Sequence, residues 1–341
     1  MNVLVTGSSG HLGEALVRTL PAHHYQVVGI DRIPGPFTHR VGSITDRSFV
    51  EQCLQGIDAV IHTATLHKPH VATHTYQDFV DTNITGTLHL LEEAQRAGLS
   101  AFVFTSTTST FGDALTPRPG APAVWVDEDL APIPKNIYGA TKTAAEDLCQ
   151  LFHRNHGLPC LVLRTSRFFP EEDDQVTRRQ AFADDNLKVN ELLHRRVDLA
   201  DAVDAHRLAL EKAPALGFGR YIISTTTPFA RHHQHRLIND APGVVQELFP
   251  GSEAEYTRRG WALFPKIDRV YDNQRARAAL GWEPVYTFRH VLDLLKAEKD
   301  WRSPLARGVG VKGYHDRPFA EGPYPVEQGT AGMRDRIRQQ R

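Results

Sequence analysis

Residues 6–13 read Thr-Gly-Ser-Ser-Gly-His-Leu-Gly and stand between an apolar run at residues 3–5 and an amphipathic run that starts at residue 12. Glycines in this spacing permit a tight turn, a close approach of the backbone to a pyrophosphate, and close packing of the next helix on the strand. The first turn of that helix also offers free N–H groups and the positive end of its dipole to phosphates. The stretch predicts a phosphate-binding turn for a dinucleotide; a glycine-rich turn without a ligand is the alternative. The residues expected to contact the cofactor here are Gly7, Ser9, Gly10, His11, Leu12 and Gly13.

Asp31 ends the second apolar run, residues 26–30, at the distance from the glycines where a dinucleotide-binding fold places an acidic residue. A carboxylate there accepts hydrogen bonds from both ribose hydroxyls of the adenosine and repels a 2′-phosphate, which favours NAD over NADP. Arg32 keeps NADP open as the less favoured cofactor, because a guanidinium beside the site could bind that phosphate. A cap of a turn or helix is the alternative role for Asp31.

Strands and helices alternate along the first two thirds of the chain. We expect strands at residues 3–6, 26–30, 59–62, 101–105, 160–164 and 220–225, and helices at residues 12–20, 46–55, 76–97, 138–155 and 197–212. Apolar strands in strict alternation with helices indicate a parallel sheet that is buried on both faces. The expected fold class is α/β: a Rossmann-type doubly wound parallel sheet with a smaller, mixed C-terminal substrate lobe.

The domain limits follow from where the alternation of strands and helices is interrupted. Residues 113–135 contain five prolines and are expected to form a loop, residues 280–299 a turn and a helix, and residues after 301 no clear element. We expect the dinucleotide-binding domain at residues 1–168 with returning segments at about 196–228 and 266–275. The substrate lobe is expected at residues 169–195, 229–265 and 276–320, and a tail at residues 321–341.

The composition argues against several classes of partner. The 341 residues contain 39 basic and 40 acidic side chains, so charge gives no reason to expect a nucleic acid or an anionic membrane as partner. No apolar run approaches the length of a membrane helix, and the first one is too short for a signal peptide. Three widely spaced cysteines without a CxxC pair are typical of buried thiols in a reducing compartment. We therefore expect a cytoplasmic location.

Tyr138 and Lys142 are four residues apart in an expected helix and therefore share one of its faces. A phenol is a poor base near neutral pH, but a nearby ammonium and an oxidised nicotinamide both favour the phenolate. Tyr138 could then accept the proton of a hydroxyl that becomes a carbonyl, while Lys142 holds the nicotinamide ribose. The hydroxyl-rich stretch at residues 105–110 follows a strand and could orient the substrate oxygen. Taken alone, the pair could also be a surface tyrosine stacked on a lysine.

The ordered set of motifs resembles the extended short-chain dehydrogenase/reductase family, the group of NAD-dependent sugar epimerases and dehydratases. The resemblance covers most of residues 1–300. Its matching pieces are residues 6–13, Asp31, Ser43 and Ile44 before Asp46, and residues 58–65, 83–87, 105–113, 138–142, 163–164, 197–206 and 279–284.

The resemblance implies roles for individual residues. It places Ser43 and Ile44 at the adenine, and Asn83 in the long helix beside the active site. Thr107 falls where the family has its catalytic Ser or Thr. The helices that hold Asn83 and Tyr138 are implied to form the four-helix interface of a homodimer. Further cofactor contacts are expected from Thr63, Ala64, Thr65, Thr105 and Thr165.

Two departures from the family pattern bear on the reaction and the substrate. Dehydratases of the family have Asp and Glu directly after the catalytic Ser or Thr, whereas this chain has Thr108 and Ser109, so dehydration is not expected and decarboxylation is disfavoured. Arg167 stands where nucleotide-sugar epimerases have an Asn, so the substrate need not be a UDP-sugar. Arg167, Arg195 and Arg196 are either anion-binding residues or solvated residues of the lobe.

Two groups of histidines remain. His67, Lys68 and His70 are expected over the substrate pocket, where they touch substrate or are ordinary loop residues. Residues 232–235 (His-His-Gln-His) have no acidic or cysteine partner at a recognised spacing, so we expect no metal. The possible substrate contacts are thus His67, Lys68, Thr108, Arg167 and Arg196.

We interpret the chain as an NAD-dependent oxidoreductase acting on a C–OH/C=O centre. The favoured activity is that of a sugar or nucleotide-sugar epimerase, which transfers a hydride transiently to bound NAD. A simple NAD(P)-dependent dehydrogenase or ketoreductase of a non-nucleotide substrate is the alternative. A non-catalytic NAD-binding regulator is a more remote one, since such a protein would be expected to have lost Tyr138 or Lys142.

Overall fold

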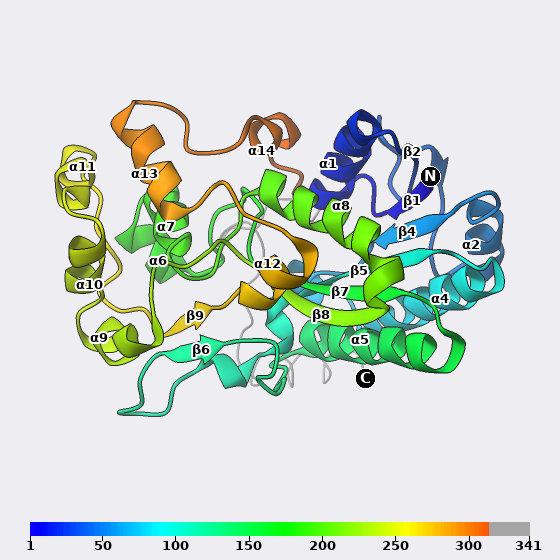
Figure 1. The fold of residues 1–341 in the computed structure, drawn as a ribbon, viewed down its shortest axis with the longest axis horizontal. Coiled ribbons are helices and arrows are strands. Elements are labelled where there is room, and N and C mark those ends of the chain that lie inside the picture. Colours follow the sequence, from blue (N-terminus) through cyan, green and yellow to red (C-terminus); the bar gives the residue numbers. More distant parts are fainter. Residues whose placement is uncertain (314–341) are drawn as a thin grey trace, which may run out of the picture.

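A computed structural model describes residues 1–313, so the expected tail at residues 321–341 lies outside the described residues. Its central sheet has seven parallel strands in the order β3-β2-β1-β4-β5-β7-β8 (Figure 1). The expected doubly wound α/β fold is therefore confirmed. The strands are β1 (Asn2–Thr6), β2 (Gln26–Asp31), β3 (Arg40–Val41), β4 (Ala59–His62), β5 (Ala101–Thr107), β7 (Cys160–Thr165) and β8 (Phe218–Ile223).

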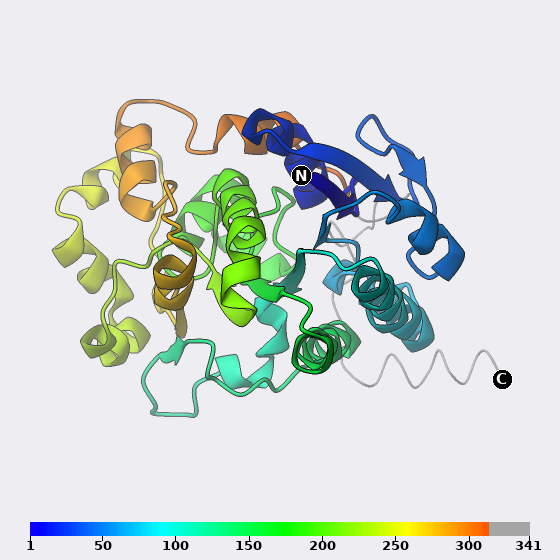
Figure 2. The same ribbon diagram turned by 45° about the vertical axis from the view of Figure 1, so that its right-hand side comes forward.

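Helices cover both faces of the sheet because alternate strand residues point to opposite sides. Val3 and Val5 of β1 pack with α1 (His11–Thr19) and α8 (Leu199–Leu216). Leu4, between them in sequence, belongs to the core formed with the helices of the other face. Those helices are α2 (Arg47–Cys53), α4 (Gly86–Arg96) and α5 (Ile137–His156). Figure 2 shows helices on both sides of the sheet.

Most expected elements agree with the structure to within a few residues. Asp46 caps α2, as expected, and its carboxylate accepts from the backbone N–H of Ser48 and Phe49. The helix expected at residues 76–97 is interrupted: α3 (Tyr76–Phe79) and α4 are separated by the π-helical turn η3 (Val80–Thr85). A π turn has one more residue than an α turn and leaves little mark on hydrophobic periodicity, so the sequence pattern did not reveal it.

The second part of the molecule is a mostly helical lobe with its own apolar core (Figure 1). Two expectations for this part were wrong. The expected loop at residues 113–135 contains β6 (Val124–Val126), which pairs with β9 (Arg269–Tyr271), and α14 (Pro304–Val309) lies in the stretch expected to have no element. The remaining helices are α6 (Val176–Ala181), α7 (Asp184–Glu191), α9 (Gln234–Asn239), α10 (Ala241–Leu248), α11 (Ser252–Arg258), α12 (Gln274–Leu280) and α13 (Phe288–Lys296).

Candidate active site

The glycine turn joins β1 to α1 in the geometry that a pyrophosphate needs. Gly7 has a φ of +75°, a conformation that favours glycine. A Cβ on Gly13 would lie 1.9 Å from the carbonyl oxygen of Gly7, so only glycine lets α1 pack this closely on the turn. Gly10 is the N-cap of α1 and has no side chain to accept from the first-turn N–H groups, which leaves them available to an anion. The turn therefore fits the pyrophosphate of NAD.

The carboxylate of Asp31 is held against this turn. Its Oδ2 accepts from the backbone N–H of Ser9 at 3.0 Å, and its Oδ1 accepts from the N–H of Ile33 at 2.9 Å. Asp31 thus acts as the turn cap considered from the sequence, and each of its oxygens still has acceptor capacity for a ribose hydroxyl. Arg32 is exposed beside it.

Ser43 and Ile44, the residues predicted to contact the adenine, lie between β3 and α2. Ile44 is buried, and a Cβ on Gly86 would lie 2.6 Å from its Cγ1, so this glycine lets α4 approach closely. The hydroxyl of Ser43 is 2.8 Å from that of Thr45. Their contact with adenine stays a prediction.

The segment after β4 is fastened to the end of β1. The hydroxyl oxygen of Thr6 accepts from the backbone N–H of Thr63 and Ala64, each at 3.1 Å, and Thr63 Oγ1 donates to the carbonyl of Thr6 at 2.6 Å. Atoms of Thr63 and Ala64 also lie 2.8 Å from the position that a Cβ on Gly7 would occupy. Thr63 and Ala64, two of the expected cofactor contacts, therefore border the glycine turn directly.

Asn83 lies in the π-helical turn and forms hydrogen bonds both to the segment after β4 and to α5. Its Oδ1 accepts from the hydroxyl of Thr65 and from the N–H of Leu66, both at 2.8 Å. Its Nδ2 donates to the carbonyl of Leu66 at 3.1 Å and to the hydroxyl of Thr141 at 3.0 Å. Asn83 therefore fixes the segment after β4 against α5, the helix of Tyr138 and Lys142, and acts as a positioning residue.

Tyr138 and Thr107 meet where β5 ends and α5 begins. Burial raises the pKa of Tyr138 to about 12, and a hydrogen bond with the Thr107 side chain acts in the opposite direction. The lowering of the Tyr138 pKa by Lys142 together with an oxidised nicotinamide stays a prediction. Thr165 pairs with Thr107 in the sheet, which places it beside the same site.

Lys142 is fully buried and points at the end of β5. Its Nζ donates to the carbonyl oxygen of Thr105 at 2.7 Å and lies 3.9 Å from the ring centroid of Phe104. Burial lowers the pKa of Lys142 to about 7, while the charge of Glu146 acts to raise it. The hydroxyl of Thr105 is engaged by His206 Nε2 at 2.9 Å.

Glu146 is a buried neighbour of Lys142 that the sequence pattern did not indicate. It forms a buried ion pair with Arg164 at 2.7 Å and accepts from the hydroxyl of Ser106 at 2.5 Å. Glu146 lies one helical turn beyond Lys142, so extending the Tyr138–Lys142 spacing by four residues could have found it.

His67 and Thr108 border the residues predicted to be catalytic, Tyr138 and Thr107. The ring centroids of His67 and Tyr138 are 6.1 Å apart, and burial holds the pKa of His67 well below its ordinary value. Thr108 is buried directly after Thr107, whose hydroxyl accepts from the N–H of Ser109 at 3.1 Å. The structure thus brings two of the possible substrate contacts to the site.

The arginines surround one carboxylate of α7. Glu191 is fully buried and accepts from Arg195 at 2.6 Å, Arg196 at 2.9 Å and Arg167 at 3.2 Å. Although burial acts to raise it, these guanidinium groups hold the pKa of Glu191 well below its ordinary value. The alternative of solvated lobe residues is wrong for Arg195 and Arg196, which are buried.

Acidic residues after β7 engage the remaining predicted cations. Arg167 also pairs with Asp173 at 2.7 Å, and Lys68 pairs with Asp174 at 2.7 Å. The Lys68–Asp174 pair joins the segment after β4 to the segment after β7, whereas the Arg167–Asp173 pair lies within the latter. The chain therefore supplies carboxylate partners to Lys68, Arg167 and Arg196 from its own residues.

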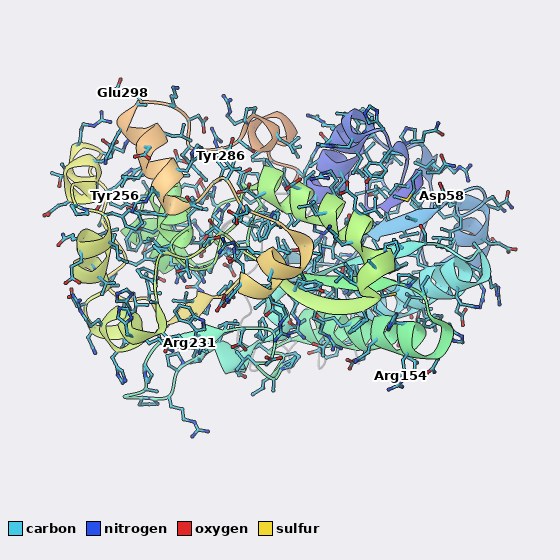
Figure 3. All side chains as sticks on the ribbon, in the orientation of Figure 1. Asp58, Arg154, Arg231, Tyr256, Tyr286 and Glu298 are labelled. Atoms are coloured by element: carbon cyan, nitrogen blue, oxygen red, sulfur yellow. The ribbon has the colours of Figure 1, made fainter. Side chains whose placement is uncertain are left out.

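The other histidine group lies in the lobe, away from this site. Residues 231–239 form a short helical segment next to β6, where Arg231 pairs with Asp127 at 3.1 Å (Figure 3). Within residues 1–313, no group of three or more His, Cys, Asp or Glu side chains is arranged to hold a metal ion. The same part of the chain has no helix long and apolar enough to span a membrane.

A parallel sheet with this glycine turn, and with Thr107, Tyr138 and Lys142 at its carboxyl edge, defines an NAD-dependent enzyme of the short-chain dehydrogenase/reductase type. The family model described as "NAD dependent epimerase/dehydratase family" matches residues 3–220. The chain belongs to this family.

Its similarity to individual proteins extends over most of its length. It is 27% identical to a UDP-glucose 4-epimerase of Rhizobium meliloti, over 90% of this chain and 98% of the relative. It is also 27% identical to a 3 beta-hydroxysteroid dehydrogenase/Delta 5→4-isomerase of Mycobacterium tuberculosis, over 85% and 88%. A crystal structure of a UDP-glucose 4-epimerase with UDP-glucose from Thermotoga maritima shares the fold, with a TM-score of 0.60 and 23% identity over 86% and 97%.

Proposed function

We propose that the chain is a nucleotide-sugar epimerase that inverts a hydroxyl-bearing carbon. The observation that carries the proposal is the placement of Thr107, Tyr138 and Lys142 where β5 ends, at the same carboxyl edge of the sheet as the glycine turn after β1. The UDP-glucose 4-epimerase of Rhizobium meliloti, similar over almost the whole of both chains, supports the substrate class.

The roles of the residues follow from their positions. NAD, when bound, would supply the acceptor for the hydride of the substrate carbon and then the donor that returns it to the opposite face of the ketone. Tyr138, as the phenolate, takes the hydroxyl proton while the C–OH group becomes C=O, and gives it back when the carbonyl is reduced. Thr107 hydrogen-bonds the reacting oxygen and orients it toward Tyr138. Lys142 holds the nicotinamide ribose, and the glycine turn with Asp31 holds the pyrophosphate and the adenosine ribose.

Dehydration is not part of the proposal. Elimination of water needs a general acid and a general base close to the reacting carbon. Thr108 and Ser109 occupy the two positions after Thr107, and neither hydroxyl ionises near neutral pH.

A net dehydrogenase of a non-nucleotide substrate is the second candidate. It is favoured by Arg167 and Arg196, whose guanidinium groups already bind Glu191 and other groups of the chain instead of standing open to a diphosphate. The similarity to a steroid dehydrogenase supports the same reading. The two candidates differ in the fate of the ketone, which stays bound in an epimerase and leaves in a dehydrogenase.

The test is incubation of the purified chain with UDP-glucose or UDP-galactose and catalytic NAD, followed by chromatography of the sugar nucleotides and NADH absorbance. Interconversion without net NADH is the expected result. Stoichiometric NADH formation from any substrate would favour the dehydrogenase. Tyr25→Phe is the matched control for variants of Tyr138, because the Tyr25 hydroxyl contacts Glu211 of α8 rather than the site.

We further propose a homodimer formed through α4 and α5. Leu151 is 37% exposed on the outer face of α5, and Arg154 lies at the same end of this helix (Figure 3). Light scattering after size exclusion should give twice the chain mass, and Leu151→Glu should give the monomer. A monomeric wild type contradicts this interface.

The domain limits and the location in the cell are also proposals. A division into a cofactor domain and a substrate lobe is supported by the separate apolar cores of the two parts. A cytoplasmic location is supported by Cys53, Cys149 and Cys160, which are buried free thiols. Limited proteolysis and cell fractionation test the two proposals.

A further inference from the structure

A cavity of about 430 Å³ lies apart from the catalytic residues, and neither Thr107, Tyr138 nor Lys142 lines it. It is bounded by α7 of the lobe, the start of α8, and residues of the segment that leads through α14. Tyr286, one of its wall residues, is labelled between the lobe helices and α8 (Figure 3). Phe168 and Trp301 add two further aromatic side chains to the wall.

The cations that line this cavity are all engaged by carboxylates. Lys188 pairs with Asp184, Arg196 with Glu191 at 2.9 Å, and Arg302 with Asp300 at 2.7 Å. The cavity therefore presents little uncompensated positive charge to a ligand.

The carboxylates of the wall are less completely neutralised. Within residues 1–313, neither Asp185 nor Asp198 forms a salt bridge, and Asp198 is held by the uncharged backbone N–H groups of Ala200 and Ser303. The five carboxylates of the wall exceed its three cations. The balance of charge favours a cationic ligand.

Two buried polar atoms of wall residues have no partner in the described chain. Glu171 is 7% exposed; its Oε1 binds His11 at 2.8 Å and the N–H groups of Lys312 and Gly313, whereas its Oε2 has no hydrogen bond. Trp301 is also 7% exposed, and its indole N–H has no acceptor. A buried polar group without a partner costs free energy and calls for an explanation, such as a ligand.

We propose that this cavity binds a small molecule that carries an ammonium group together with a hydroxyl or another hydrogen-bond acceptor. The ammonium group donates to Glu171 and is attracted by Asp185 and Asp198. The acceptor takes the indole N–H of Trp301. The rings of Phe168, Tyr286 and Trp301 offer faces on which an organic cation is favourably placed.

Calorimetric titration of the full chain with three ring compounds of one size tests the site. The probes are 4-aminocyclohexanol, uncharged cyclohexane-1,4-diol and anionic 4-hydroxycyclohexanecarboxylate. The amine should bind about tenfold more tightly than the diol, and the anion more weakly than both. Equal affinities, a preference for the anion, or no heat from the amine would overturn the proposal.

Variants connect the binding to this cavity rather than to the catalytic site. Glu171→Gln should weaken the amine about tenfold and leave the diol almost unchanged, because it removes charge with little change of shape. Asp185→Asn, at an exposed position that tolerates substitution, should weaken the amine in the same direction if Glu171→Gln does not fold. Tyr138→Phe should leave the affinity unchanged. Loss of amine binding in Tyr138→Phe, or unchanged binding in both acidic variants, would contradict the assignment.

Discussion

Lys142 donates a hydrogen bond from its buried ammonium group to the carbonyl oxygen of Thr105, 2.7 Å away. This contact holds helix α5 against the carboxyl end of β5, two residues before Thr107. One helix and one strand therefore fix Tyr138, Thr107 and Lys142, the residues proposed to act as base, to orient the substrate and to hold the ribose. Different substitutions at this junction should therefore affect cofactor binding, proton transfer or stability one at a time.

Replacing Tyr138 by Phe should lower kcat about 10²- to 10⁴-fold, the usual contribution of a positioned general acid–base group. The ring remains to fill the space between Leu66 and Phe79, so folding and NAD affinity should change little. Epimerisation rates and titration with NAD measure the two effects. A variant that keeps wild-type kcat would remove Tyr138 from the reaction, and Tyr25→Phe should behave as wild type.

NAD affinity should depend on the protonation of Lys142. Because burial lowers its pKa to about 7, the ammonium form prevails below that pH and is lost as the pH rises. Loss of a charge-assisted hydrogen bond to the ribose should weaken NAD about tenfold between about pH 6 and pH 8.5. Lys142→Met should bind NAD weakly at both pH values. A wild-type affinity that is flat across this range would contradict the role of the ammonium.

Glu146→Gln should destabilise the fold by about 3–5 kcal/mol, because it leaves Arg164 buried without a counter-charge. The double variant Glu146→Leu/Arg164→Met should recover part of this loss. Denaturant unfolding measures both. Glu247→Gln, which breaks an exposed pair with Arg236, is the matched control and should have no measurable effect. Equal stability of Glu146→Gln and Glu247→Gln would contradict the argument.

Asp201 should make stability fall as the pH rises. Burial raises the pKa of Asp201 to about 7 in the folded chain, although its carboxylate accepts from the N–H groups of Val285 and Tyr286. The folded state therefore holds a proton that the unfolded state releases near pH 4, so this contribution is present below about pH 4 and lost as the pH rises toward 7. The loss should amount to a few kcal/mol, because each tenfold change in an acid dissociation constant corresponds to about 1.4 kcal/mol. The free energy of unfolding at pH 5 and at pH 7.5 measures this loss, and Asp201→Asn should remove most of the difference between the two values. An equal difference in the variant would show that another group causes it.

The sequence was sufficient for the sheet because its signals are local. Val3, Leu4 and Val5 are apolar on both faces of one strand, and Gly13 satisfies a steric demand that is set by the nearby carbonyl of Gly7. The same holds for Tyr138 and Lys142, which one helix turn brings together.

The sequence was not sufficient to predict contacts between residues that are far apart in the chain. Glu191 of α7 meets Arg167 of the segment after β7, and no spacing in the chain reveals that pair. The pairing of β6 with β9 joins residues 145 apart in register, and the strands are only three residues long. The low exposure of Arg195 and Arg196 depends on the whole lobe, so their charge alone wrongly allowed a solvated position.

The π-helical turn at Val80–Thr85 limits which changes of length this helix can accept during evolution. Deleting one residue there would restore an unbroken α-helix but rotate one side against the other by about 100°. Either Asn83 would turn away from Leu66 and Thr141, or Leu90 and Leu91 would leave the sheet core. Descendants of this chain should therefore accept exchanges of side chains in this turn far more readily than single-residue insertions or deletions.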